Sequence, residues 1–201
     1  MVLRPIKKYP EKVLRKKAKE VTRFGILLDQ LVEDMAKTMY AAPGVGLAAP
    51  QIGISRRVIV IDVGKGLISM INPKIVERQG SEVGVEGCLS FPNFYGDVER
   101  PAIITVKYQN LQEQWEKLQA DELLARAIQH EIDHLDGIVF IDKAVNLRYI
   151  VPEEFKNISG CRQEVGSVDS DRRSMLSTDR QEVGSAECDR MSWQSAAASI
   201  A

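Results

Sequence analysis

Apolar residues recur at helical spacing in two segments of the chain. Over Ile26–Tyr40 they stand three or four positions apart, and the run Ala41-Ala42-Pro43-Gly44 supplies a stop signal. The second segment extends from about Asp121, a residue type that favours the N-cap, to Gly137, which favours a C-terminal stop. Its apolar stripe consists of Leu124, Ile128, Ile132 and Leu135. The pattern predicts two amphipathic helices, and a shorter helix is expected over Glu11–Lys19.

Short runs rich in β-branched residues, bounded by turn residues, predict strands elsewhere. The runs are Arg57–Val63, Leu67–Ile71, Lys74–Glu77, Ser81–Ser90 and Ala102–Tyr108. Asn72-Pro73 predicts a turn between the second and third runs. Because strands follow one another without regular helix alternation, we expect an α+β fold. Its antiparallel or mixed strands should pack around the helix that begins near residue 121.

Composition divides the chain near residue 157. Beyond it the sequence is rich in Ser, Arg, Asp and Glu, has few large aliphatic residues and contains no Lys. Arg162–Ser167 recurs as Arg180–Ser185, an imperfect tandem duplication too short to stack a core of its own. We therefore expect a folded catalytic domain over residues 1–157 and a disordered tail over residues 158–201.

Charge and cysteine content exclude several classes of protein. The formal net charge of −1 over 201 residues leaves no electrostatic footprint for direct, sequence-specific nucleic-acid binding. The chain has no apolar stretch of about 18 residues and no secretory signal, so no membrane association is expected. Three cysteines form no disulfide framework, which favours a cytoplasmic, reduced protein.

The second helix contains His130-Glu131-Ile132-Asp133-His134, with the only two histidines of the chain. Residues four apart share one helix face, so both imidazoles can reach one metal ion while Glu131 takes a proton from water. Ala127 lies on the same stripe as the histidines, beside the apolar stripe. The alternative is a chance pattern on a solvated helix face.

A catalytic metal site of this kind needs a third protein ligand. Cys88, in Glu86-Gly87-Cys88-Leu89-Ser90, is the strongest candidate because a thiolate binds Zn²⁺ or Fe²⁺ well. The alternative for a lone cysteine is a small buried hydrophobe. A further unusual segment, Gly44–Gln51, has small residues that let a backbone approach a ligand, and Gln51 adds an amide. Alone, it would be interpreted as a helix-to-strand turn.

Together these segments resemble peptide deformylases. That family carries GxGxAAxQ, EGCxS and HExDH in this order, which match Gly44–Gln51, Glu86–Ser90 and His130–His134. The resemblance covers roughly residues 3 to 150, and Tyr9–Arg15 and Gly96–Pro101 also look like family sequence. It implies a metal-dependent hydrolase that removes the N-formyl group from N-formylmethionine of newly made polypeptides. It also implies nascent peptides as partners, with docking on the ribosome as an option.

The resemblance assigns roles to individual residues. Cys88, His130 and His134 match the ligands of one divalent metal ion, Fe²⁺ first, with Zn²⁺, Ni²⁺ or Co²⁺ as alternatives. Glu131 matches the general base and acid. The remaining matches are the Leu89 backbone N–H and the Gln51 side chain as oxyanion donors, Gly46 as a backbone contact to substrate, and Val45, Leu123 and Ala127 as the lining of a methionine pocket.

Two other functions remain open from the residues alone. An HExxH metallopeptidase would need a further ligand downstream of the helix, and the sequence offers none. A non-catalytic metal-binding domain would need a fourth protein ligand that closes the site.

Overall fold

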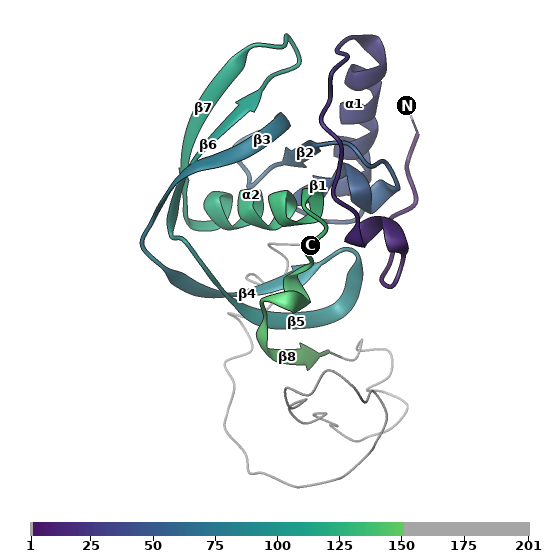
Figure 1. Ribbon diagram of the computed structural model, residues 1–201. Helices are drawn as coiled ribbons and strands as arrows, with labels where there is room; N and C mark the ends of the chain where they lie inside the picture. The colour runs from purple at the N-terminus through teal and green to yellow at the C-terminus, as the bar shows by residue number, and fades with distance from the viewer. Residues whose placement is uncertain (1, 151–201) are drawn as a thin grey trace, which may run out of the picture.

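The computed structural model describes residues 2–150, so the predicted boundary at 157 and the tail 158–201 lie outside the described residues. Figure 1 shows a central helix, α2 (Glu122–Leu135), between two antiparallel sheets. The five-stranded sheet has the order β1-β2-β3-β6-β7, with strands Gly46–Ala48, Val58–Ile61, Ile68–Gln79, Ile103–Gln109 and Trp115–Asp121. The three-stranded sheet has the order β4-β5-β8, with strands Glu82–Cys88, Phe91–Arg100 and Val145–Tyr149. Helix α1 (Ile26–Ala41) and the 3₁₀ turns η1 (Lys12–Arg15), η2 (Ala49–Ile52) and η3 (Phe140–Asp142) complete the fold.

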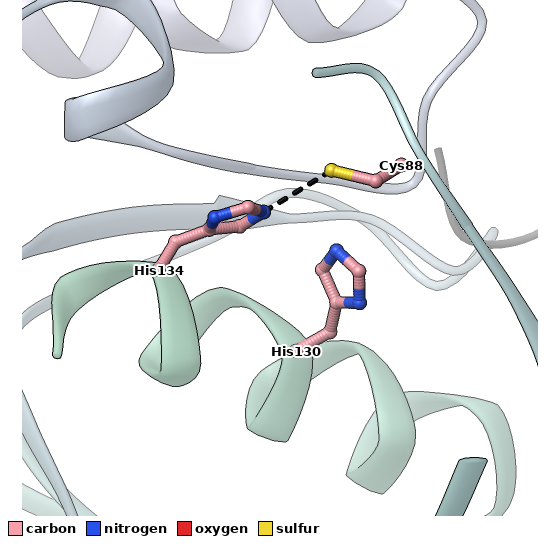
Figure 2. Close-up of side chains that lie close together, drawn as sticks. All are labelled: Cys88, His130 and His134. Carbon is pink, nitrogen blue, oxygen red and sulfur yellow. Dashed lines mark hydrogen bonds between the residues drawn. The ribbon is translucent and has the colours of Figure 1, made fainter. Parts of the chain in front are cut away.

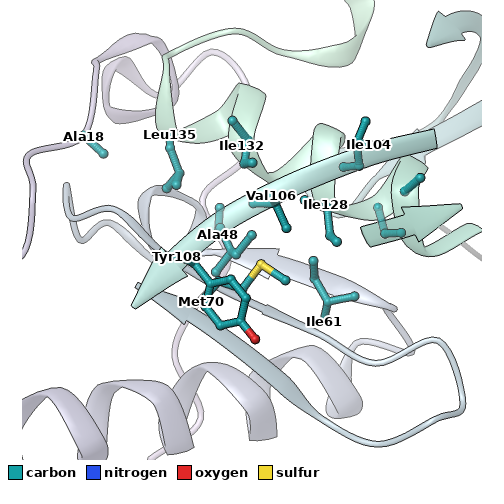
Figure 3. Close-up of a cluster of buried hydrophobic side chains, with 14 residues drawn as sticks. Ala18, Ala48, Ile61, Met70, Ile104, Val106, Tyr108, Ile128, Ile132 and Leu135 are labelled. Carbon is teal, nitrogen blue, oxygen red and sulfur yellow. The ribbon is translucent and has the colours of Figure 1, made fainter. Parts of the chain in front are cut away.

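Strand β2 explains why the five-stranded sheet needs a helix on each face. Its four residues, Val-Ile-Val-Ile, are all fully buried, and alternate side chains of a strand point to opposite faces. Ile59 and Ile61 join the cluster under α2, whereas Val58 and Val60 join the cluster under α1. Figure 3 shows the first of these clusters, where Ile128, Ile132 and Leu135 meet strands of the sheet. The α+β prediction is confirmed.

The predicted helix over Glu11–Lys19 was wrong beyond Arg15. Only the 3₁₀ turn η1 forms, and the chain then runs extended toward the end of α2. The Ala18 N–H donates to the Leu135 carbonyl at 2.7 Å, and Lys19 forms a parallel bridge with Arg56. These distant backbone partners replace the hydrogen bonds that a longer helix would have supplied.

The predicted turn at Asn72-Pro73 was also wrong, because β3 runs through it. The pairing of β3 with β6 shifts register between Ile71 and Lys74, so the two residues form a bulge. Proline has no N–H to donate and is tolerated at such a position. Asn72 adopts φ 52°, and its amide bonds to Val21 across the loop before α1.

Candidate metal centre

Helix α2 presents both histidines to the end of β4. His130 and His134 are 2% and 1% exposed, and their ring centroids lie 5.0 Å apart. Cys88 is the last residue of β4, and its Sγ lies 3.2 Å from His134 Nε2. One ligand atom from each of the three residues falls within 4.8 Å of the others. Figure 2 shows both rings rising from the helix toward the sulfur.

These three donors fit a divalent transition metal. One sulfur and two imidazole nitrogens are ligands that Zn²⁺ and Fe²⁺ accept in proteins. His130 Nδ1 lies 2.9 Å from Glu86 Oε2, a contact that leaves Nε2 of the same ring available for a metal. Gathering three buried polar groups without a cation costs free energy, because each loses its hydration. The cluster is therefore consistent with a site made for a metal ion.

A buried ionic cluster supports His130 from behind. Glu86 is fully buried and accepts hydrogen bonds from Arg100, including Nη2 to Oε2 at 2.8 Å, and from Arg126 Nη1 to Oε1 at 3.0 Å. Arg100 also donates to Asp133 at 2.8 Å. Burial by itself raises the pKa of Glu86, but the hydrogen bonds from Arg100 and His130 outweigh it and hold that pKa well below the usual carboxyl range. The carboxylate is thus a fixed negative charge.

Glu131 follows His130 on α2, and its carboxylate lies against Gly46 of β1. It is 1% exposed, and its Oε2 has no hydrogen-bond partner among the described residues. Burial, aided by the charges of Glu86 and Asp133, raises its pKa to about 7. A Cβ at Gly46 would lie 2.6 Å from Glu131 Oε1. Only a glycine at position 46 therefore leaves the carboxylate where it is.

The two predicted oxyanion donors lie beside Cys88. Gln51 is buried, and its Oε1 accepts from the Ala48 N–H at 2.7 Å. That bond aims Nε2 at the centre, 3.6 Å from Cys88 Sγ and 3.4 Å from Ser90 Oγ. Leu89 follows Cys88 in the β4–β5 connection, and its carbonyl accepts from Lys8 Nζ. The η2 turn and the end of β4 thus bring the two segments together.

The three residues predicted to line a methionine pocket flank the same helix. Ala127 is fully buried in the cluster under α2, and Val45 packs against that cluster half-buried. Leu123 lies half-buried one helical turn before Ala127. Val45 and Ala127 thus share one cluster, and the role of all three residues stays a prediction.

The comparisons with known proteins agree with one another. The family model described as polypeptide deformylase matches residues 3–149. The chain belongs to the polypeptide deformylase family. A peptide deformylase of Caldicellulosiruptor bescii is 51% identical over 156 residues, which cover 78% of this chain and 93% of that protein. One of Pelotomaculum thermopropionicum is 53% identical over 144 residues, covering 72% and 93%.

Solved structures of deformylases show the same fold. The peptide deformylase of Thermotoga maritima has a TM-score of 0.71 at 45% identity and covers 72% of this chain and 99% of its own. A Synechococcus elongatus deformylase solved with actinonin has a TM-score of 0.70 at 46% identity, covering 71% and 79%.

Family membership settles the activity. The protein is a metal-dependent hydrolase that removes the N-formyl group from newly made polypeptides, and the predicted resemblance is confirmed. The family match excludes the two alternative functions, an HExxH metallopeptidase and a non-catalytic metal-binding domain. Within residues 2–150, no helix is long and apolar enough to cross a membrane.

Sequence reasoning assigned no role to Glu86, Arg100 or Arg126, although all three are buried around His130. One signal was available for Arg126. It stands four residues before His130 and so shares its helix face, where a cation needs a carboxylate partner if that face is buried.

Proposed function

We propose that Cys88, His130 and His134 hold the divalent metal, and that Fe²⁺ is the ion used in the cell, with Zn²⁺, Ni²⁺ or Co²⁺ as substitutes. The observation that supports this set most is the buried sulfur within 3.2 Å of His134 Nε2, next to a second imidazole on the same helix face. With one thiolate ligand the centre would keep a net positive charge, which lowers the pKa of the water that attacks the formyl carbon.

Glu131 acts as general base and then as general acid. It accepts a proton from the attacking water and returns it to the departing amine nitrogen. In the metal-free protein burial raises its pKa to about 7, and a divalent cation beside it would lower that pKa and favour the carboxylate that accepts the proton. Its unpaired Oε2 leaves one oxygen available for that proton.

Negative charge grows on the formyl oxygen as water adds, and two donors are proposed to receive it. They are the Leu89 backbone N–H and the Gln51 side-chain amide. The Gln51 Nε2 contacts of 3.6 and 3.4 Å are long, so this N–H group can bond more strongly to an oxyanion than it does now. One such donor is worth roughly 3–4 kcal/mol in the transition state.

The proposed substrate is the N-formylmethionyl end of a nascent peptide. Val45, Leu123 and Ala127 would receive the methionine side chain, and the Gly46 backbone would contact the peptide. The Gly44–Gln51 segment would form a tight mouth to the site, which would admit a formyl group and exclude larger acyl groups. Action in the cytoplasm, on chains at the ribosome, agrees with this substrate. The catalytic domain is proposed to span residues 1–157.

Formate release from a formyl-methionyl tripeptide, measured together with elemental analysis, tests the ligand set. Cys88→Ala should lose both the bound metal and the activity, whereas Cys161→Ala, a matched cysteine in the tail, should keep both. Full metal retention by Cys88→Ala would refute the assignment of Cys88 as a ligand.

A further inference from the structure

Arg126 is a nearly buried cation that the chemistry described above does not use. It lies on α2 one turn before His130, and its side chain is 10% exposed. Its Nη1 donates to Glu86 Oε1 at 3.0 Å and to the Val98 carbonyl at 2.8 Å, and its Nη2 donates to the Glu82 carbonyl at 2.9 Å. A buried guanidinium persists only where its donors are matched in this way.

The partners of Arg126 belong to the hairpin that carries Cys88. Glu82 begins β4 and Cys88 ends it, while Val98 lies on β5. One side chain of α2 therefore donates hydrogen bonds to backbone carbonyls of both strands of the hairpin. It also supports His130 through the carboxylate of Glu86, which lies 2.9 Å from His130 Nδ1.

Gly84 shows that the chain makes room for this contact. Gly84 lies opposite Val98 in the β4–β5 register, directly beneath the guanidinium. A Cβ at position 84 would lie 2.8 Å from Arg126 Cζ and 2.9 Å from both Nε and Nη2. Any other residue at this position would displace the guanidinium.

We propose that Arg126 is a positioning residue for the metal centre. It sets the distance between the strand that supplies the sulfur ligand and the helix that supplies the nitrogen ligands, an inference that rests on the proposed ligand set. An arginine suits this task because its planar fork makes several hydrogen bonds in fixed directions, which a lysine ammonium does not.

The affinity of the protein for Co²⁺ distinguishes a residue that positions the metal ligands from one that only stabilises the fold. The Co²⁺-loaded full-length chain is titrated with a chelator, and its visible absorption reports the bound metal and the thiolate ligand. Arg126→Gln should weaken Co²⁺ binding about 10- to 100-fold, as loss of a group that orients metal ligands does. The control is Arg57→Gln, whose side chain is 13% exposed and ties the end of α2 to the sheet through Asp136, 2.7 Å away.

Arg57→Gln should lower the Tm but change the Co²⁺ affinity no more than about twofold, because its side chain bonds to Asp136 and the Pro73 carbonyl and to neither Glu86 nor the β4–β5 hairpin. Equal affinities of the two variants would overturn the proposal and leave Arg126 a structural residue.

Gly84→Ala keeps the arginine but displaces its guanidinium, so it should also weaken Co²⁺ binding, and it decides the matter if Arg126→Gln does not fold. Unchanged affinity in Gly84→Ala would then overturn the proposal. A wild-type Co²⁺ spectrum without a thiolate band would instead refute the proposed ligand set itself.

Discussion

The two sides of the metal centre treat buried polar groups differently. Behind His130, the oxygens of Glu86 accept hydrogen bonds from Arg100, Arg126 and the imidazole. On the other side, Glu131 Oε2 and His134 Nδ1 are buried without partners among the described residues. Buried polar atoms are usually paired, so unpaired ones call for an explanation in function. The comparison indicates that the paired side holds His130 in place, whereas on the unpaired side Glu131 keeps an oxygen open for the proposed proton transfer.

The paired side should carry the larger share of stability. Glu86→Gln leaves Arg126 buried without its carboxylate partner and leaves Arg100 with Asp133 alone, which is expected to cost about 3–5 kcal/mol of unfolding free energy in urea titrations of the metal-free protein. Asp97→Asn breaks a partly exposed ion pair with Arg148 and should cost no more than about 1 kcal/mol. Similar losses in both variants would mean that the cluster behind His130 is not a scaffold.

The unpaired side should matter more for rate than for stability. Gln51→Leu removes a donor that has only long contacts in the resting site, so kcat should fall about 10²- to 10³-fold while KM changes little. Steady-state kinetics on a formyl-methionyl tripeptide measure both parameters. A pure rise in KM would show that Gln51 binds the substrate but does not stabilise the transition state.

Glu131 allows the comparison to be tested by pH. Its pKa rises from about 4.5 when unfolded to about 7 when buried, so between these values the folded, metal-free protein binds the extra proton. Its contribution to stability is therefore complete below pH 4.5 and is lost as pH rises toward 7, by about 3 kcal/mol.

In Glu131→Gln the side chain is a neutral amide that does not titrate, so this pH dependence of the stability is removed. The variant, compared with wild type in denaturant titrations from pH 4.5 to 8, should gain relative stability with rising pH. If the unfolding free energies of wild type and variant changed in parallel with pH, burial would not be raising the pKa of Glu131.

The difference between the two sides also separates what the sequence could predict from what it could not. The histidines, Glu131 and Cys88 stand in short motifs, and the helix that carries two of the proposed ligands has a local periodicity. Besides Glu86, the partners of Arg126 are backbone carbonyls 28 and 44 residues away, and no residue type marks a carbonyl as an acceptor. The scaffold of the site is therefore less visible in the sequence than its chemistry.

The same reasoning explains the strands that the pattern missed. Strand β5 contains Pro92, Asn93 and Gly96, which read locally as turn residues, yet pairing with both β4 and β8 holds it extended. Strand β7 has largely exposed side chains and is held by its register with β6. Asp121 ends β7, and its side chain makes no capping bond to α2, although its residue type suggested one.

Removal of residues 158–201 should have the smallest effect. The residues proposed for the site lie between Val45 and His134, so none comes from the removed segment. A peptide deformylase of Alkaliphilus metalliredigens is matched over 99% of its length by 145 residues of this chain, so that relative has no counterpart to most of the removed segment. The truncated chain should keep its Tm and its kcat/KM for a formyl-methionyl tripeptide.

A fall in Tm of about 4 °C or more, equivalent to roughly 1 kcal/mol or more in a domain of this size, would place the domain boundary beyond residue 157. Slower deformylation of ribosome-bound chains alone would instead give the segment a role in docking, with both sides of the metal centre intact.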